Sequence, residues 1–160
     1  MTGYRFFLAR DLTILTLTIL LWALLPAGDA GQIATGGLTG LCALLFHEHG
    51  HVFGARKAGA HVQFAPKWSP FIFNLNPAEN TRTQLLSTSL WGFAATGVFV
   101  ILFLLVLPTD TLAGVVGLSI GLLLASLTVF IEFPIAWRMS RGYAVPDLSI
   151  FKSQGNGGDD

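Results

Sequence analysis

Charged residues are scarce in this sequence. Asp, Glu, Lys and Arg form 11% of the 160 residues, less than half of the roughly 25% that is usual in soluble domains. Hydrophobic residues form 52% and the mean hydropathy is +0.64, which is the balance of a membrane protein. The formal net charge is zero, so the composition gives no reason to expect nucleic acid as a partner.

Cysteine is almost absent as well. Cys42 has no second cysteine with which to form an internal disulfide, and we expect it to be a small buried side chain. The length allows one domain, which we assign to residues 1–153 as a single membrane domain. Residues 154–160 are polar and rich in glycine, and we expect them to form a disordered tail.

Long stretches without charge predict four membrane-spanning helices, over residues 12–28, 33–55, 85–107 and 112–137. The first stretch has 17 uncharged residues, the third has 23, and the fourth has 20 before Glu132 interrupts it. A helix needs about 20 such residues to cross a bilayer. The expected fold class is therefore an all-α polytopic membrane protein.

The basic residues predict how these helices are oriented. All nine Lys and Arg residues lie before the first span, between the second and third, or after the fourth. The other two connections, AGDAGQ and PTDT, contain neither Lys nor Arg. Because these residues are retained on the cytoplasmic side of short loops, we expect both termini in the cytoplasm. The expected location is a bacterial or archaeal cytoplasmic membrane.

The first span has a second interpretation. Basic residues, an apolar stretch and the small residues around Asp29 also form the pattern of a signal peptide with its cleavage site. The apolar stretch exceeds the usual ~7 to 15 residues, which favours a retained span. The intact mass of the purified protein distinguishes the two interpretations.

The segment between the second and third spans cannot be one continuous helix. It reads HVQFAPKWSPFIFNLNPAEN and has three prolines among aromatic residues. We predict short strands or a loop at the cytoplasmic membrane surface. Within the spans, two pairs of glycines have the four-residue spacing that lets helices approach closely. These pairs are Gly36 with Gly40 and Gly117 with Gly121.

The polar cluster HEHGH follows directly on an apolar run. His47 and His51 are four residues apart, so on a helix they share one face and can bind the same metal ion. Glu48 lies about 100° round the helix, where its carboxylate can take a proton from a metal-bound water. This is the HExxH pattern. His49 points to the opposite face, and we interpret it as a helix-packing residue.

The depth of this cluster is informative. If its helix continues to Arg56, His47 lies roughly 13 Å inside the cytoplasmic boundary, at about 1.5 Å per residue. Ionisable groups inside a span are costly and usually mark function.

The stretch FHEHGHVFGARKAGAHVQF resembles the active-site segment of the site-2 protease family of intramembrane zinc metalloproteases. The shared features are HExGH, an Ala-Arg pair, and a glycine before a strand-like segment. A looser likeness extends to TQLLSTSLWGFAATGVFVILF and to FIEFPIAWRMSRGYAVPDLSIF. The resemblance thus covers roughly residues 33–153 and leaves the first span as an addition.

The resemblance implies an enzyme that hydrolyses peptide bonds in or near the transmembrane segments of membrane-anchored proteins. It implies one Zn²⁺ per chain, with His47, His51 and Asp147 as ligands and Glu48 as the catalytic base. In the family the third ligand is an aspartate followed by glycine, shortly after an Asn-x-x-Pro element. Here Pro134 matches that proline, and Leu148 replaces the glycine after Asp147.

Two alternatives stay open at this point. Glu132 lies within the fourth span, and an acid inside the membrane is a functional candidate, so it competes with Asp147 as third ligand. The chain is also compatible with a catalytically impaired homologue that acts as a membrane binding or regulatory module. A metal or proton transporter is less favoured, since the four spans show no inverted repeat. The expected partners are a membrane-anchored protein substrate and the lipid bilayer.

Overall fold

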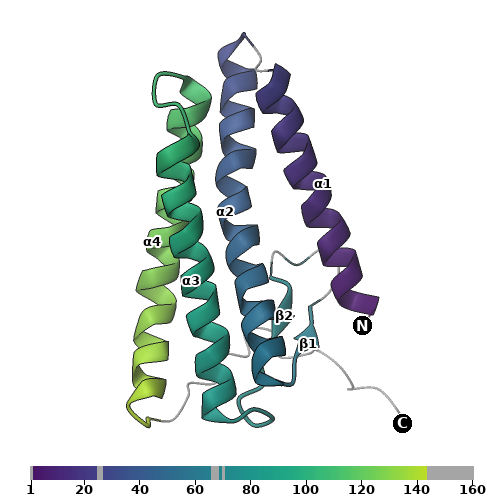
Figure 1. Cartoon of the computed structure of the whole chain (residues 1–160), viewed down its shortest axis with the longest axis vertical. Coiled ribbons are helices and arrows are strands. Elements are labelled where there is room, and N and C mark those ends of the chain that lie inside the picture. Colours follow the sequence, from purple (N-terminus) through teal and green to yellow (C-terminus); the bar gives the residue numbers. More distant parts are fainter. Residues whose placement is uncertain (1, 25–26, 66–68, 70, 144–160) are drawn as a thin grey trace, which may run out of the picture.

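The computed structural model describes residues 2–24, 27–65, 69 and 71–143. Four long helices dominate these residues, and a small antiparallel sheet lies between the second and the third (Figure 1). In chain order the elements are α1 (Thr2–Leu24), α2 (Asp29–Ala58), β1 (Gln63–Phe64), β2 (Phe73–Asn74), α3 (Arg82–Val106) and α4 (Leu112–Ser140). The prediction of an all-α fold with short strands after the second helix is confirmed.

Helix α2 is the centre of the bundle. It packs against α1, α3 and α4, and α3 also packs against α4. The sheet lies beside α2 near the N-terminal end of α1 (Figure 1). A hydrophobic cluster joins the three parts there, because Phe7 of α1 and Val52 of α2 pack with Ala65 and Ile72, which flank the strands. This arrangement places the sheet against the second half of α2.

Three of the four helices have the length and composition of membrane spans. These are α1 from Gly3 to Leu24, α3 over its full length, and α4 over its full length. They are the features of an integral membrane protein. The 30 residues of α2 are sufficient in length, but its second half contains HEHGH and ends with Arg56 and Lys57. That α2 also spans a membrane therefore remains a prediction.

The first predicted span starts too late. The prediction placed it at residues 12–28, whereas α1 begins at Thr2 and ends at Leu24. The difference arises because the charged residues Arg10 and Asp11 directly precede the uncharged stretch from which the span was predicted. In the structure they lie inside α1 as an ion pair, with 2.6 Å between Arg10 Nε and Asp11 Oδ1. The other three helices begin and end within a few residues of their predicted spans.

Local sequence explains where the helices stop and start. Gly59 ends α2 with a left-handed backbone (φ +66°), a conformation that glycine adopts without steric cost. Thr81 begins α3 with a capping box, in which its hydroxyl accepts from the Gln84 N–H and the Gln84 side chain accepts from the Thr81 N–H. Thr111 begins α4 by accepting from the Gly114 N–H.

Both predicted glycine pairs lie where helices pack closely. A Cβ on Gly36 would lie 2.8 Å from the Val116 Cβ and 3.0 Å from the Gly117 nitrogen, so α2 and α4 are in near-backbone contact there. A Cβ on Gly40 would overlap the Ile120 side chain of α4. On α4, a Cβ on Gly121 would lie 2.7 Å from the Phe103 ring of α3. The close α2–α4 packing therefore depends on missing side chains, as expected of small residues in membrane helices.

Replacing Gly36 by alanine should destabilise the bundle by about 1–3 kcal/mol, the usual cost of overpacking, because the added methyl group meets the α4 backbone. Gly37→Ala is the matched control, since a Cβ there meets nothing within 4 Å. The control should be neutral or slightly stabilising, because alanine favours helix over glycine. Thermal unfolding of the two variants in detergent measures the difference, and equal midpoints would contradict the packing.

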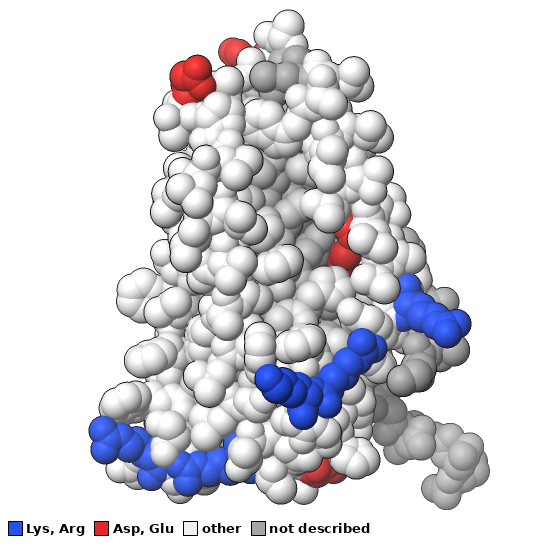
Figure 2. Space-filling view, in the orientation of Figure 1, with Lys and Arg blue, Asp and Glu red and all other residues white. Residues whose placement is uncertain are grey.

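The charged residues are distributed unevenly along the bundle. In the space-filling view, Lys and Arg gather towards the end that holds the N-terminus, and the opposite end shows acidic residues (Figure 2). The α3–α4 turn at that opposite end carries Asp110 and no basic residue. This distribution is the one from which the cytoplasmic placement of the termini was predicted.

Candidate metal centre

Two helices supply a compact group of metal-ligating side chains. His47 and His51 lie one turn apart on α2, and their Nε2 atoms are 2.9 Å apart. Glu132 of α4 faces both rings, with Oε1 3.0 Å from His47 Nε2 and Oε2 3.2 Å from His51 Nε2. One ligand atom from each residue lies within 4.8 Å of the others. Among the described residues, this group could hold a metal ion.

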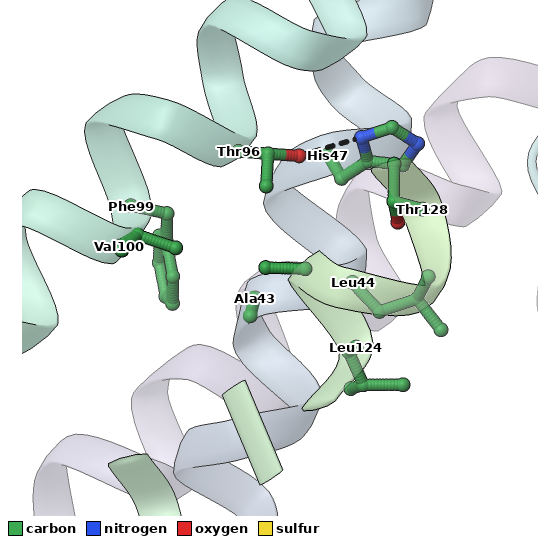
Figure 3. Close-up of a pocket in the computed structure, with 9 residues that line it drawn as sticks. Ala43, Leu44, His47, Thr96, Phe99, Val100, Leu124 and Thr128 are labelled. Atoms are coloured by element: carbon green, nitrogen blue, oxygen red, sulfur yellow. Dashed lines mark hydrogen bonds between the residues drawn. The ribbon is translucent and has the colours of Figure 1, made fainter. Parts of the chain in front are cut away.

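Hydrogen bonds from α3 orient the two rings. The Nδ1 atom of His51 is 2.9 Å from the Thr88 carbonyl oxygen. A carbonyl oxygen can only accept, so Nδ1–H donates to it. The Nδ1 atom of His47 is 2.8 Å from the Thr96 hydroxyl oxygen (Figure 3) and 3.1 Å from the Gly92 carbonyl oxygen. The Thr96 hydroxyl donates to the same Gly92 carbonyl at 3.2 Å, and its oxygen therefore accepts from His47.

These bonds place the ring protons on Nδ1, on the side away from Glu132. The two Nε2 atoms and the Glu132 carboxylate then face one another without a proton between them. When Nδ1 of a neutral imidazole carries the proton, Nε2 presents a lone pair. Two such lone pairs and a carboxylate then converge on one point, where a bound cation would relieve their mutual repulsion. Two imidazoles and one carboxylate form a known ligand set of catalytic zinc. Ring nitrogens anchored from behind are the usual outer shell of metal sites, so the donor set fits a metal ion.

Small residues bring α3 close enough to make these contacts. A Cβ on Gly92 of α3 would overlap the His51 ring. On α2, a Cβ on Gly50 would lie 2.6 Å from the Trp91 carbonyl oxygen, and one on Gly54 would lie 2.8 Å from the Ser87 carbonyl oxygen. The two histidines therefore reach α3 backbone carbonyls because glycines line both sides of the contact.

Glu48 lies beside this group and outside it. Its residue is 6% exposed, and its Oε2 accepts a hydrogen bond of 3.1 Å from the Ile72 N–H. Ile72 directly precedes β2, so the segment leading into the sheet holds this carboxylate. A buried carboxylate with a backbone donor on one oxygen has a defined position.

The metal group and Glu48 share a cavity of about 420 Å³. This volume is typical of sites that bind small molecules or peptide side chains. Most of its wall is hydrophobic and comes from α3, α4 and the segment around β2. Examples of these lining residues are Phe71, Phe73, Leu75, Leu127, Ile131 and Ile135.

A second, much smaller cavity lies behind His47, between α2, α3 and α4 (Figure 3). Its volume is about 10 Å³ and its wall is almost entirely apolar, including Ala43, Phe99 and Leu124. Such a space is at the lower limit for one water molecule. Of these two cavities, the one at the metal group is therefore the one with room for a small molecule or a side chain.

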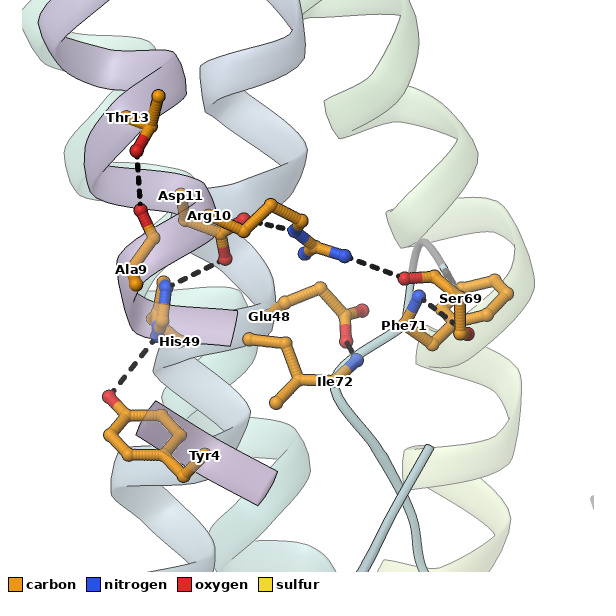
Figure 4. Close-up of polar contacts among 10 residues, drawn as sticks. All are labelled: Tyr4, Ala9, Arg10, Asp11, Thr13, Glu48, His49, Ser69, Phe71 and Ile72. Carbon is orange, nitrogen blue, oxygen red and sulfur yellow. Dashed lines mark hydrogen bonds and ion pairs between the residues drawn. The ribbon is translucent and has the colours of Figure 1, made fainter. Parts of the chain in front are cut away.

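His49 faces the other way, as predicted. Its Nε2 is 3.0 Å from Asp11 Oδ2 and its Nδ1 is 3.3 Å from the Tyr4 hydroxyl, both on α1 (Figure 4). Asp11 is 6% exposed and also pairs with Arg10. We call Arg10, Asp11 and His49 the α1–α2 ionic cluster. His49 packs two helices together and stays outside the metal group.

The structure brings some of the predicted site residues together and does not describe others. It brings His47 and His51 together with Glu132, the alternative third ligand, and places Glu48 next to them. Asp147 lies outside the described residues. The sequence analysis missed Asp11, which adjoins the apolar run and would have been found if the first helix had been extended through it. Nothing in the sequence marks Thr96 as a site residue, because a threonine in an apolar helix usually bonds to the backbone of its own helix.

Replacing Thr96 by valine should weaken metal binding by roughly tenfold, the lower end of the 10–100-fold cost of removing an outer-shell partner. The loss is limited because the Gly92 carbonyl can still accept from His47. Thr13→Val is the control, since the exposed Thr13 hydroxyl bonds to the Ala9 carbonyl within α1. Competition with a zinc chelator measures both affinities, and equal values would remove Thr96 from the site.

The described residues thus form a helical bundle of an integral membrane protein with a possible metal-binding group at its centre. Comparison with known protein families, with curated proteins and with solved structures finds no match to this chain. Its function is therefore inferred from the geometry of its own residues.

Proposed function

We propose that this protein is an intramembrane zinc metalloprotease of the site-2 protease type, which hydrolyses peptide bonds in or near the transmembrane segments of membrane-anchored proteins. The observation that carries the proposal is the meeting of His47, His51 and Glu132 at one point, beside Glu48, in one cavity. The spacing of HExxH alone supports two ligands and a base. The approach of an acid from α4 supplies the third ligand that catalytic zinc requires.

We propose Glu132 as the third ligand in place of Asp147. Both of its oxygens lie within 3.2 Å of a histidine Nε2, and its side chain is 32% exposed, so it is accessible from the cavity. A carboxylate in this position neutralises part of the charge of a divalent cation inside an apolar bundle. Two histidines and one glutamate leave the fourth position of a tetrahedral ion open.

The chain's own groups then have distinct roles. A bound Zn²⁺ would lower the pKa of a water at its open position to about 7 and polarise the scissile carbonyl. The Glu48 carboxylate accepts the proton of the attacking water and passes it to the leaving amine. The backbone N–H of Ile72 keeps that carboxylate turned to the cavity. The hydrophobic walls exclude bulk water, which strengthens each of these interactions.

The substrate has to be extended when it is cut. In a helix, the scissile bond is covered by the hydrogen bonds from each residue to the fourth residue along the chain. Phe73 and Leu75, in and just after β2, line the cavity next to the metal group. An unwound substrate segment can pair with this short strand by β-strand addition while its side chains occupy the apolar cavity. This mode suits transmembrane segments, whose side chains are themselves apolar.

The proposal places α2 across the membrane with the other three helices. The metal group then lies within the bilayer, in the half of α2 that ends with Arg56 and Lys57. Figure 2 shows Lys and Arg gathered towards one end of the bundle. By the distribution of Lys and Arg, that end is cytoplasmic. We therefore propose cleavage close to the cytoplasmic face of the membrane in which this protein resides.

Metal analysis and a cleavage assay together test the proposed function. The purified full chain in detergent should contain one zinc per chain and cut a single-span peptide, and a chelator should stop cleavage until zinc is returned. The same assay in lipid vesicles establishes that the cut occurs in a membrane. Stoichiometric zinc without cleavage of any membrane peptide would overturn the protease, whereas weak or absent zinc binding without cleavage would support the membrane binding or regulatory module.

A further inference from the structure

The α1–α2 ionic cluster is a costly feature that the proposed chemistry does not use. Asp11 is 6% exposed within a helix that has the composition of a membrane span. The Arg10 guanidinium is also largely covered, and its Nη2 atom is buried without an acceptor among the described residues. Buried ion pairs contribute little net stability, and an unsatisfied buried donor opposes folding. Ionisable groups at such positions in a span usually serve a function.

One arm of the cluster leads towards the catalytic carboxylate. Arg10 Nε donates to Asp11 Oδ1 at 2.6 Å, and Arg10 Nη1 donates to the Ser69 carbonyl oxygen at 2.7 Å (Figure 4). Ser69 lies three residues before Ile72, whose N–H donates to Glu48 Oε2 at 3.1 Å. Two short contacts, one from Arg10 to Ser69 and one from Ile72 to Glu48, therefore lie three residues apart on the same segment.

The same segment is attached on its other side to the sheet. The Ile72 carbonyl accepts a hydrogen bond of 3.0 Å from the Ala65 N–H, and the Ile72 side chain is fully buried against Phe7 and Val52. Ile72 is thus held by its side chain, its carbonyl and its N–H. Arg10 adds a fixed point three residues upstream, at the Ser69 carbonyl.

We propose that Arg10 is a positioning residue for Glu48, acting through the Ser69 carbonyl and the Ile72 N–H. The proposal rests on the proposed role of Glu48 as the base. Asp11 accepts from Arg10 Nε and is bonded on its other oxygen to His49 Nε2, so the cluster orients the Arg10 guanidinium, and this gives it a function. Helix α1 is then part of the catalytic apparatus, although the resemblance to site-2 proteases covers only the chain after it.

Loss of the Arg10 contact should release the segment that carries Ile72. The Ile72 N–H then loses part of its bond to Glu48, and we expect its amide exchange with solvent to rise roughly tenfold, the equilibrium worth of one hydrogen bond. The Glu48 carboxylate would move from its place beside the metal group. A misplacement of about 1 Å can cost roughly 100-fold in rate, so kcat should fall by up to that factor.

The experiment compares three variants of the full chain in detergent micelles. Arg10→Gln removes the charge and the fork of donors, Arg10→Lys keeps one charged donor, and Arg5→Gln removes the same charge from an exposed position of the same helix. Amide exchange at Ile72 is followed by nuclear magnetic resonance, and kcat, KM, zinc content and the unfolding midpoint are measured alongside. The intact mass establishes that α1 is present in the purified protein.

The expected result is faster Ile72 exchange and lower kcat in Arg10→Gln, partial recovery in Arg10→Lys, and wild-type behaviour in Arg5→Gln. Zinc content should stay the same in all three. Unchanged Ile72 exchange in Arg10→Gln would overturn the positioning role. Equal effects of Arg5→Gln and Arg10→Gln would overturn it as well. In either case, peptide cleavage by the wild-type protein would leave the proposed function standing. If the wild type cuts no peptide, the proposed function fails, and the exchange measurement still decides whether Arg10 holds the Ile72 segment.

Discussion

Glu48→Gln should reduce peptide cleavage by about 10²–10⁴-fold, the usual contribution of a general base, and leave the zinc content of the protein unchanged. The two effects separate because Glu48 adjoins the metal group without belonging to it. Glutamine keeps the size of the side chain and can still accept from the Ile72 N–H through its carbonyl oxygen. It cannot take a proton from water, so binding should survive while the chemical step is lost.

Cleavage rates of wild type and variant on one single-span peptide, with zinc measured on the same samples, check this result. Glu79→Gln is a suitable control, because Glu79 is exposed before α3 and bonds only locally to the Asn76 side chain. It should behave as the wild type. Equal cleavage by Glu48→Gln and wild type would rule out Glu48 as the base and, with it, the mechanism proposed here.

Glu132→Ala should lower zinc affinity by at least about 100-fold, beyond the 10–100-fold range for loss of an outer-shell partner. The alanine removes the carboxylate that faces both histidines and leaves only two neutral imidazoles to bind the cation. Because zinc binds the folded state, added zinc should raise the unfolding midpoint of the wild type and have little effect on this variant. Chelator competition and thermal unfolding at several zinc concentrations provide the two measurements.

Asp147→Ala is the comparison that decides between the two candidate ligands. If Glu132 is the ligand, Asp147→Ala retains zinc, and Asp110→Ala, at the opposite end of the bundle, retains it as well. Zinc lost from Asp147→Ala and kept by Glu132→Ala would make Asp147 the third ligand, as the resemblance to site-2 proteases implies. Glu132 would then be a partly buried acid bonded to the histidines of a neighbouring helix.

The local geometry of the site was predictable from the sequence. The four-residue spacing of His47 and His51 places both rings on one face of any α-helix, and the intervening His49 on the other. The structure has this arrangement. The close packing at the glycine pairs was equally predictable, because small residues spaced four apart form a smooth stripe that another helix can approach. These features depend on neighbours in sequence, and their physics is that of a single helix.

The start of α1 was not predictable from apolar length. Counting uncharged residues treats Arg10 and Asp11 as a boundary, since isolated charges are excluded from lipid. In the folded chain the two neutralise each other, and His49 of α2 supplies a further partner. The cost of burying them is thus offset by a residue 38 positions away, which a window over the sequence cannot detect.

The long apolar stretches and the HExxH pattern were enough to predict a bundle of long helices, two histidines on one helix face and a glutamate beside them. The sequence by itself left the third ligand open between two acids, because no spacing rule connects α2 with a residue 85 positions later. The tertiary structure decided which described acid meets the histidines. Close packing at Gly36 and Gly117 sets the height of α4 against α2, and Glu132 reaches His47 at that height. Likewise, only the packing of α1 and the sheet against α2 joins Arg10 to Glu48.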